Sequence, residues 1–221
     1  RVDITGRKQF PFIVWSDASF EKGVGIIGWL AHDPATGEWW QSSLIVPPYF
    51  YEFFRVLDTY IFPLEILAAL SFYITICPSL IRGRQVIHFV DNFASCSCLL
   101  NGYCKHLDCA VLVHYVSIVT AFLNIVVFWD WVPSKANPGD NPSRLDYDLG
   151  RYLGAYDVLC AIPTARDLMG KFGDFCELYL NVEYFTRARA SFTSAQRIAR
   201  RRINKRRIDS GICGEEDVAD R

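Results

Sequence analysis

The N-terminal part of the chain alternates apolar and polar positions in the manner of β-strands. Residues 9–19, QFPFIVWSDAS, predict one strand. Residues 23–33, GVGIIGWLAHD, and residues 38–46, EWWQSSLIV, predict the two strands of an antiparallel hairpin, because the PATGE sequence between them carries the Pro and Gly that favour turns. Three consecutive strands therefore open the domain.

Helical and strand patterns alternate after this hairpin. Residues 63–77, PLEILAALSFYITIC, predict a helix whose first residue is proline. Residues 86–91, VIHFVD, predict a short buried strand, and residues 92–102, NFASCSCLLNG, predict a helix closed by its final glycine. The aromatic segment 47–60 predicts no regular element.

Residues 110–129 form an uncharged run, AVLVHYVSIVTAFLNIVVFW, that is long enough to test as a membrane span. Asp108 and Asp130 flank it, without the Lys/Arg cluster that anchors a span. The pattern changes at Asn124, from a helical stripe to the β-branched and aromatic residues of a buried central strand. A helix followed by a strand accounts for the run, and a membrane fragment remains the less favoured alternative. The element order β-β-β-α-β-α-α-β-α predicts a mixed α/β sheet flanked by helices.

Length and composition favour one globular domain with an extension. The chain has 221 residues, of which 51% are hydrophobic and 15% aromatic, which excludes a disordered or fibrous protein. We expect a domain over residues 10–153, a short helical extension over 154–182, and a basic then acidic tail or linker over 183–221. The absence of an initiating Met and of a signal peptide suggests a piece of a longer polypeptide.

The eight cysteines predict free thiols rather than a metal or disulfide framework. Four of them, Cys96, Cys98, Cys104 and Cys109, lie close in sequence but contain no C-x2-C pair, which zinc sites usually need. Buried free thiols indicate a reducing intracellular compartment, cytoplasmic or nuclear.

Four acidic residues lie where chemistry is expected in such a sheet. Asp17 is predicted to end the first strand, Glu65 to lie in the first turn of the first helix, Asp91 to end the fourth strand, and Asp140 to open the helix after the fifth. Each has a simpler interpretation, as a hydrated or helix-capping residue. Glu65, however, has almost only apolar neighbours, so its carboxylate needs a partner such as a divalent cation.

Clustered carboxylates of this kind suit phosphodiester hydrolysis. Two hard cations can activate water and stabilise the leaving oxygen, and Mg²⁺ prefers oxygen ligands. We assign Asp17 as the bridging ligand, Glu65 and Asp91 to one ion, and Asp140 to the other.

Four sequence blocks resemble the ribonuclease H domain of retroelement reverse transcriptases, especially of LTR and tyrosine-recombinase retrotransposons. They are WSDASFEKGVGIIGWL, FPLEILAAL, FVDNFAS and WVPSKANPGDNPSR, in the family's order. The resemblance implies a ribonuclease H-like fold with a five-stranded sheet, three strands antiparallel and two parallel. It also implies cleavage of the RNA strand of RNA/DNA hybrids to leave 3′-hydroxyl ends, two Mg²⁺ or Mn²⁺ ions, and the reverse transcriptase domain of the same polyprotein as a partner.

The chain departs from this family at three points. The interval between the first two blocks is long, which suggests an insertion in the aromatic segment 47–60. Gly139 replaces the usual Ala before Asp140, and the preceding loop offers Lys135 where many retroviral relatives carry His. A catalytically silent binding or connection module of the same fold is therefore the main alternative.

Charge gives a weaker indication of the substrate. Residues 1–180 hold 13 basic and 18 acidic side chains, and residues 181–221 hold 10 and 6, with RIARRRINKRR over 197–207. Two divalent ions would offset part of the acidic excess, and the basic run would bind phosphates, or else form a solvated linker or targeting stretch. The candidate nucleic-acid contacts are Ser19, Asn92, Arg82, Arg84, Lys135, Arg197, Arg200, Arg201 and Arg202. Among the histidines, His88 and His114 are predicted in the core, and His32 and His106 at the surface.

Overall fold

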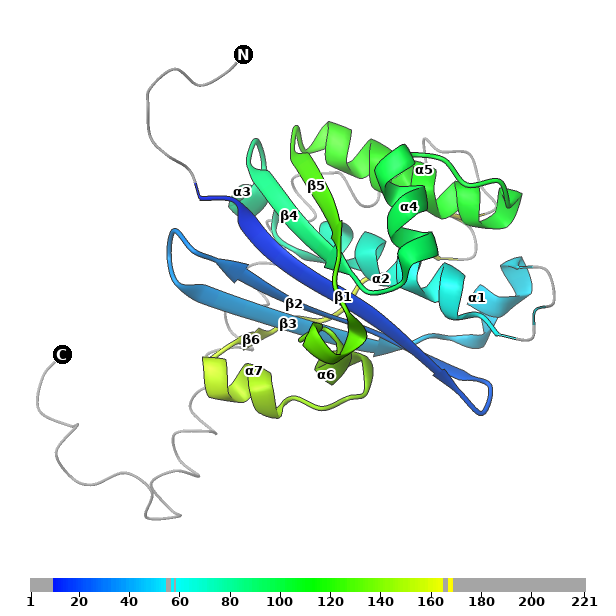
Figure 1. Cartoon of the computed structure of the whole chain (residues 1–221), viewed down its shortest axis with the longest axis horizontal. Coiled ribbons are helices and arrows are strands. Elements are labelled where there is room, and N and C mark those ends of the chain that lie inside the picture. The colour runs from blue at the N-terminus through cyan, green and yellow to red at the C-terminus, as the bar shows by residue number, and fades with distance from the viewer. Residues whose placement is uncertain (1–9, 55–56, 58, 165–166, 169–221) are drawn as a thin grey trace, which may run out of the picture. The chain divides into compact units, whose positions relative to one another are not determined.

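The computed structural model describes residues 10–54, 57, 59–164 and 167–168. Within them, the chain forms one mixed sheet of six strands in the order β5-β4-β1-β2-β3-β6 (Figure 1). The strands are β1 Phe12–Glu21, β2 Val24–Asp33, β3 Glu38–Ile45, β4 Gln85–Val90, β5 Val126–Trp131 and β6 Tyr156–Asp157. The first three pair antiparallel, and β4 and β5 add in parallel beside β1. This is the arrangement predicted for a ribonuclease H-like domain, extended by the short strand β6.

The strand β1 is longer than predicted, and Asp17 lies inside it rather than at its end. Lys22 and Gly23 both have positive φ, 51° and 79°, so they form a tight two-residue turn that lets β1 and β2 pair up to Glu21 and Val24. On its other side, β1 pairs with β4 only as far as Ser16. Asp17 is therefore the first residue of β1 beyond the end of β4.

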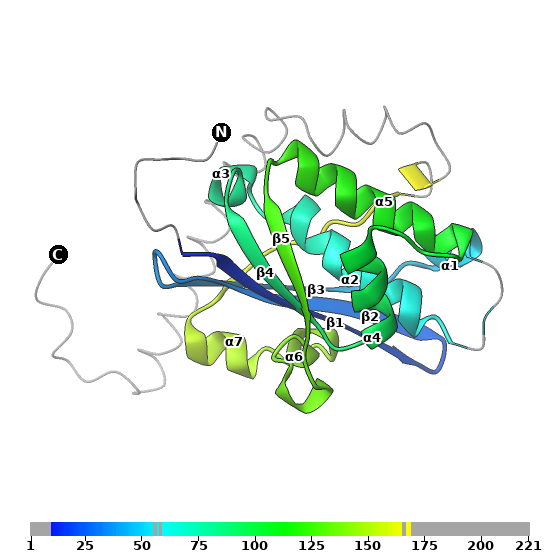
Figure 2. The same cartoon turned by 45° about the horizontal axis from the view of Figure 1, so that its top comes forward.

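Helices cover both faces of the sheet. They are α1 Pro48–Phe53, α2 Ile61–Thr75, α3 Pro78–Ile81, α4 Phe93–Asn101, α5 Leu107–Phe122, the 3₁₀ helix η1 Ser134–Ala136, α6 Asp140–Ser143 and α7 Asp148–Leu153. Figure 2 shows α2, α4 and α5 on one side and α6 and α7 on the other. Two glycines of β2 allow close packing of a helix on each face. A Cβ on Gly25 would meet Leu64 of α2, and a Cβ on Gly28 would meet Ser143 of α6.

Several helix boundaries agree with the sequence pattern, and one differs. α4 ends before Gly102, which adopts the predicted left-handed conformation with φ 62°. α2 begins at Ile61, two residues before Pro63, because proline is tolerated within a first helical turn. Glu65 consequently lies in the second turn of α2, not in the first.

The strand β5 is an edge strand, and the prediction of a buried central strand is wrong. Val126 and Phe128 are 58% and 53% exposed. Apolar composition indicated a strand correctly, but the position of that strand in the sheet depends on long-range pairing. None of the helices in the described residues is long and apolar enough to span a membrane.

The core contains His88 but not His114. His88 is fully buried, with hydrogen bonds of 2.9 Å between Nδ1 and the Tyr73 hydroxyl and between Nε2 and the Ser16 hydroxyl. Burial lowers its pKa to about 3, so the ring is neutral. His114 is exposed on α5, contrary to the prediction, because its position on the helix faces solvent. His32 and His106 are half-buried.

The chain continues into the sheet beyond the predicted domain boundary at residue 153. β6 pairs in parallel with β3, and the Ala161 amide donates a hydrogen bond of 2.8 Å to the Thr75 hydroxyl of α2. The predicted extension 154–182 is described only in part, and the predicted tail 183–221 lies outside the described residues. The described cysteines, Cys77, Cys96, Cys98, Cys104, Cys109 and Cys160, are all free thiols.

Candidate metal centre

Three of the four predicted acids meet in one cluster. Asp17 of β1, Glu65 of α2 and Asp91, which directly follows β4, each place a carboxylate oxygen within 4.8 Å of the others. β4 ends one residue short of Asp17, so Asp91 enters the space beside it. The Trp131 indole donates a hydrogen bond of 2.8 Å to the Asp91 carbonyl, which fixes the chain where it leaves β4.

Burial makes this cluster electrostatically costly without a cation. Glu65 is 2% exposed, and within the described part of the chain its Oε2 has no hydrogen-bond partner. Burial, followed by the charges of Asp17 and Asp91, raises the Glu65 pKa well above its usual value. A buried carboxylate in this state needs compensation.

Asp17 is also a buried carboxylate with a raised pKa. Its pKa is raised from 3.8 to about 7, chiefly by burial, and the negative charges of Asp91 and Asp140 contribute to this rise. A hydrogen bond donated by the Ser143 hydroxyl to Asp17 Oδ2 acts in the opposite direction.

Asp140 does not join the compact group. It opens α6 and is half-buried, and its Oδ1 accepts a hydrogen bond of 2.7 Å from Arg144 Nε. Its charge still acts on Asp17, so Asp140 lies at the margin of the cluster.

The segment before Asp140 is fixed against β1. The Asn137 side chain donates a hydrogen bond of 3.1 Å to the Ser16 carbonyl and accepts one of 3.0 Å from the Gly139 amide. A Cβ on Gly139 would lie 3.0 Å from the Trp15 carbonyl oxygen. The glycine that departs from the family pattern thus suits a close approach between this loop and β1.

Sequence reasoning missed two residues beside the cluster, Ser143 and Arg144. Ser143 bonds to Asp17, and Arg144 forms an ion pair with Asp140. Both lie in the NPSR sequence that directly follows Asp140. This closeness to a predicted acid was the feature of the sequence that could have pointed to them. Neither residue type indicates such a role without the fold.

Three of the predicted nucleic-acid contacts lie near these acids. Ser19 donates a hydrogen bond of 2.7 Å to the Ser143 carbonyl, and Asn92 caps α4 by accepting one of 3.0 Å from the Ser95 amide. Lys135 is exposed in η1, on the segment that leads to Asp140. Their contacts with a substrate stay predictions.

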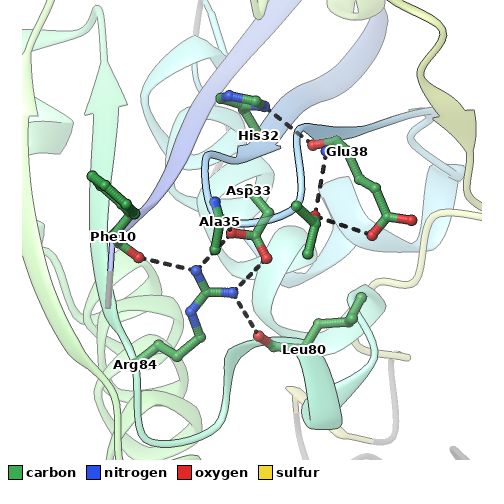
Figure 3. A network of polar contacts seen from close by, with 8 residues as sticks. Phe10, His32, Asp33, Ala35, Glu38, Leu80 and Arg84 are labelled. Carbon is green, nitrogen blue, oxygen red and sulfur yellow. Dashed lines mark hydrogen bonds and ion pairs between the residues drawn. The ribbon is translucent and has the colours of Figure 1, made fainter. Parts of the chain in front are cut away.

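Arg82 and Arg84 lie at the opposite end of β4 from Asp91. The Arg84 guanidinium binds both Asp33 carboxylate oxygens at 2.6 and 2.7 Å, and also the Phe10 and Leu80 carbonyls (Figure 3). Arg82 donates to the Phe122 carbonyl at 3.2 Å. Arg84 therefore has a structural partner for its charge. Arg197, Arg200, Arg201 and Arg202 lie outside the described residues.

The composition of the cluster fits a hard divalent cation. Its ligand atoms are all carboxylate oxygens, the ligands that Mg²⁺ and Mn²⁺ prefer, without His or Cys. The unpartnered Glu65 oxygen is an acceptor that such an ion would satisfy.

Comparison with known proteins gives a fold-level likeness only. No protein-family model and no curated protein matches the chain. Among solved structures, the N-terminal RNase H domain of a Mycobacterium tuberculosis protein, fused to maltose-binding protein, is 11% identical with a TM-score of 0.40, covering 65% of this chain and 96% of that one. RNase H1 from the archaeon Halobacterium salinarum is 11% identical with a TM-score of 0.44, covering 64% of this chain and 99% of that one. At these values, neither likeness decides the function of this chain.

Proposed function

We propose that this protein is a divalent-metal-dependent nuclease that hydrolyses the RNA strand of RNA/DNA hybrids. The observation that carries the proposal is the buried, unpartnered oxygen of Glu65 among the carboxylates of Asp17 and Asp91. A protein does not usually retain such a group unless something else satisfies it.

The three clustered acids would hold the metal. Asp17, whose pKa is raised by the charges of both Asp91 and Asp140, is the candidate bridging ligand, and Asp140 is the candidate ligand of a second ion. When bound, Mg²⁺ or Mn²⁺ supplies an activated water and stabilises the leaving oxygen of a phosphodiester. Glu65, held on α2 among apolar side chains, keeps its carboxylate fixed in place.

The choice of an RNA/DNA hybrid depends on the sequence blocks that resemble retroelement ribonuclease H. It is supported by the polar side chains of Ser19 and Asn92 next to the acids, since hydroxyl and amide groups can bond to ribose 2′-hydroxyls. We further propose that the chain works within a reverse transcriptase polyprotein, as that resemblance implies.

Cleavage of an end-labelled RNA/DNA hybrid in Mg²⁺ tests the proposal. The full chain is expected to cut the RNA strand, leave 3′-hydroxyl ends, and spare single-stranded RNA and duplex DNA. Asp17→Asn and Asp91→Asn are expected to abolish cleavage, because each removes a ligand charge. No cutting by the wild type, or equal cutting by the wild type and both variants, would contradict the proposal.

A further inference from the structure

The Ser143 hydroxyl is a buried hydrogen-bond donor aimed at Asp17. Ser143 is fully buried, and its Oγ lies within hydrogen-bonding reach of Asp17 Oδ2 and, at 3.0 Å, of the Asp140 carbonyl oxygen. A serine hydroxyl has one proton to donate, and an ionised carboxylate is a stronger acceptor than a peptide carbonyl. The Ser143 hydroxyl therefore donates its hydrogen bond to Asp17.

The backbone of Ser143 is fixed from three directions. Its amide donates a hydrogen bond of 3.2 Å to the Gly139 carbonyl, and its carbonyl accepts the bond of 2.7 Å from the Ser19 hydroxyl of β1. On the side of β2, Gly28 allows a contact so close that a Cβ would lie 2.3 Å from the Ser143 amide nitrogen. The hydroxyl is thus presented to Asp17 from a preorganised position.

A neutral donor has a specific advantage at this place. It holds a carboxylate without neutralising it, whereas a Lys or Arg in the same position would compete with a bound cation. The neighbouring Arg144 instead forms ion pairs with Asp140 at 2.7 Å and Glu21 at 3.7 Å. The charge of Asp17 therefore remains available to a metal.

We propose that Ser143 is a positioning residue, whose hydroxyl fixes the orientation of the Asp17 carboxylate so that Asp17, Glu65 and Asp91 present their oxygens to one cation. This inference rests on the proposed function, because it takes Asp17 as a metal ligand. In this role Ser143 acts on the metal through Asp17, the residue to which its hydroxyl donates.

Calorimetric titration of the full chain with Mg²⁺ alone tests the inference. Ser143→Ala removes the donor, and Ser143→Cys keeps a weaker donor of similar size. Ser71→Ala is the matched control, since Ser71 is also fully buried but donates its hydroxyl bond to the Ala68 carbonyl within α2. Loss of a group that orients a metal ligand typically weakens metal affinity by about 10- to 100-fold. We expect that loss in Ser143→Ala, a smaller loss in Ser143→Cys and none in Ser71→Ala.

Hybrid cleavage separates a positioning role from a folding role. Ser143→Ala is expected to recover cleavage as Mg²⁺ is raised, while Asp17→Asn is not. If wild type and Ser143→Ala bind Mg²⁺ equally while Asp17→Asn abolishes binding and cleavage, the role of Ser143 is refuted and the nuclease stands. If the wild type neither binds Mg²⁺ nor cuts the hybrid, both proposals fall. Equal weakening by Ser143→Ala and Ser71→Ala, without recovery at high Mg²⁺, also refutes the role of Ser143.

Discussion

Two buried carboxylates in this protein, Asp33 and Glu65, have pKa values that are shifted in opposite directions. Asp33 is paired with Arg84, and although burial raises its pKa, the hydrogen bonds and charge of Arg84 outweigh burial and lower it overall. Among the described residues Glu65 has no such cation, and its pKa is raised well above the usual value. A satisfied acid indicates a structural role, and an unsatisfied one indicates a site for a ligand.

Replacement of Arg84 tests this structural role. Arg84→Met is expected to cost roughly 3–5 kcal/mol of unfolding free energy, because it removes the positive charge paired with the buried Asp33 carboxylate and leaves it with the hydrogen bond from the Ala35 amide. Arg82→Met, which changes an exposed neighbour of the same type, is expected to cost less than about 1 kcal/mol. Urea denaturation measures both. Equal losses in the two variants would contradict the structural assignment, and a loss of hybrid affinity without a loss of stability would restore Arg84 as a nucleic-acid contact.

The raised pKa of Asp17 predicts a stabilising contribution from this residue that is lost as pH rises. Between pH 3.8 and about 7, the folded state holds a proton on Asp17 that the unfolded state releases. Asp17 therefore contributes up to about 4 kcal/mol to the unfolding free energy of the metal-free protein at low pH, and this contribution is lost as pH rises over this range. His88, whose pKa is lowered to about 3, acts in the opposite direction over an overlapping range, and the raised pKa of Glu65 acts in the same direction, so the contribution of Asp17 is obtained by comparison with a variant that lacks its carboxyl group.

Urea denaturation in EDTA from pH 4 to pH 8 measures this dependence. Asp17→Asn has no titrating group at this position but keeps His88 and Glu65, so the difference in unfolding free energy between the wild type and the variant should change by up to about 4 kcal/mol across this range. Parallel curves for the two proteins would show that Asp17 is not perturbed.

At the scale of elements, the site depends on the residue at which β4 ends and on how closely α6 packs against the sheet. β4 pairs with β1 only to Ser16, which leaves space beside Asp17 for Asp91 and for Glu65 of α2. On the other face, α6 packs on β2 at Gly28 and brings Ser143 to Asp17. Short α6 has little stability of its own, so its position follows from these contacts.

Gly28→Ala is expected to displace α6 and to weaken Mg²⁺ binding. The added Cβ would lie 2.3 Å from the Ser143 amide nitrogen and 2.5 Å from the Pro142 carbonyl carbon, both backbone atoms. Overpacking of this kind typically costs about 1–3 kcal/mol. The control is Gly37→Ala, which has open space but a φ of 73°, so it should reduce stability without changing Mg²⁺ affinity. Unchanged affinity in Gly28→Ala would show that α6 does not support the metal centre.

At the scale of the whole molecule, metal binding and folding are coupled. The acids of the cluster come from β1, α2 and the end of β4, so the site exists only when these elements are assembled. A ligand that binds only the folded state stabilises it by mass action.

Mg²⁺ is therefore expected to raise the melting temperature. At a concentration of 100 times the dissociation constant, the gain is about 2.7 kcal/mol, which corresponds to a few degrees for a domain of this size. Thermal unfolding followed by circular dichroism, with and without EDTA, measures the shift. Asp91→Asn should show no shift, and the same shift in that variant would place Mg²⁺ binding elsewhere.

The sequence by itself determined the order of the main strands and helices, the strand–strand–strand opening and the choice of Asp17, Glu65 and Asp91 as candidate acids, because these depend on local periodicity and on residue types, whereas it did not predict α1, α3 or β6. Glu65 could be singled out because its neighbours in the chain are apolar. The tertiary structure alone decided that β5 lies at the sheet edge, that β1 runs past Asp17, that Arg84 binds Asp33, and that Ser143 reaches Asp17. Each of these depends on the pairing or contact of residues far apart in sequence, and local patterns of polarity carry no information about which distant group becomes the partner.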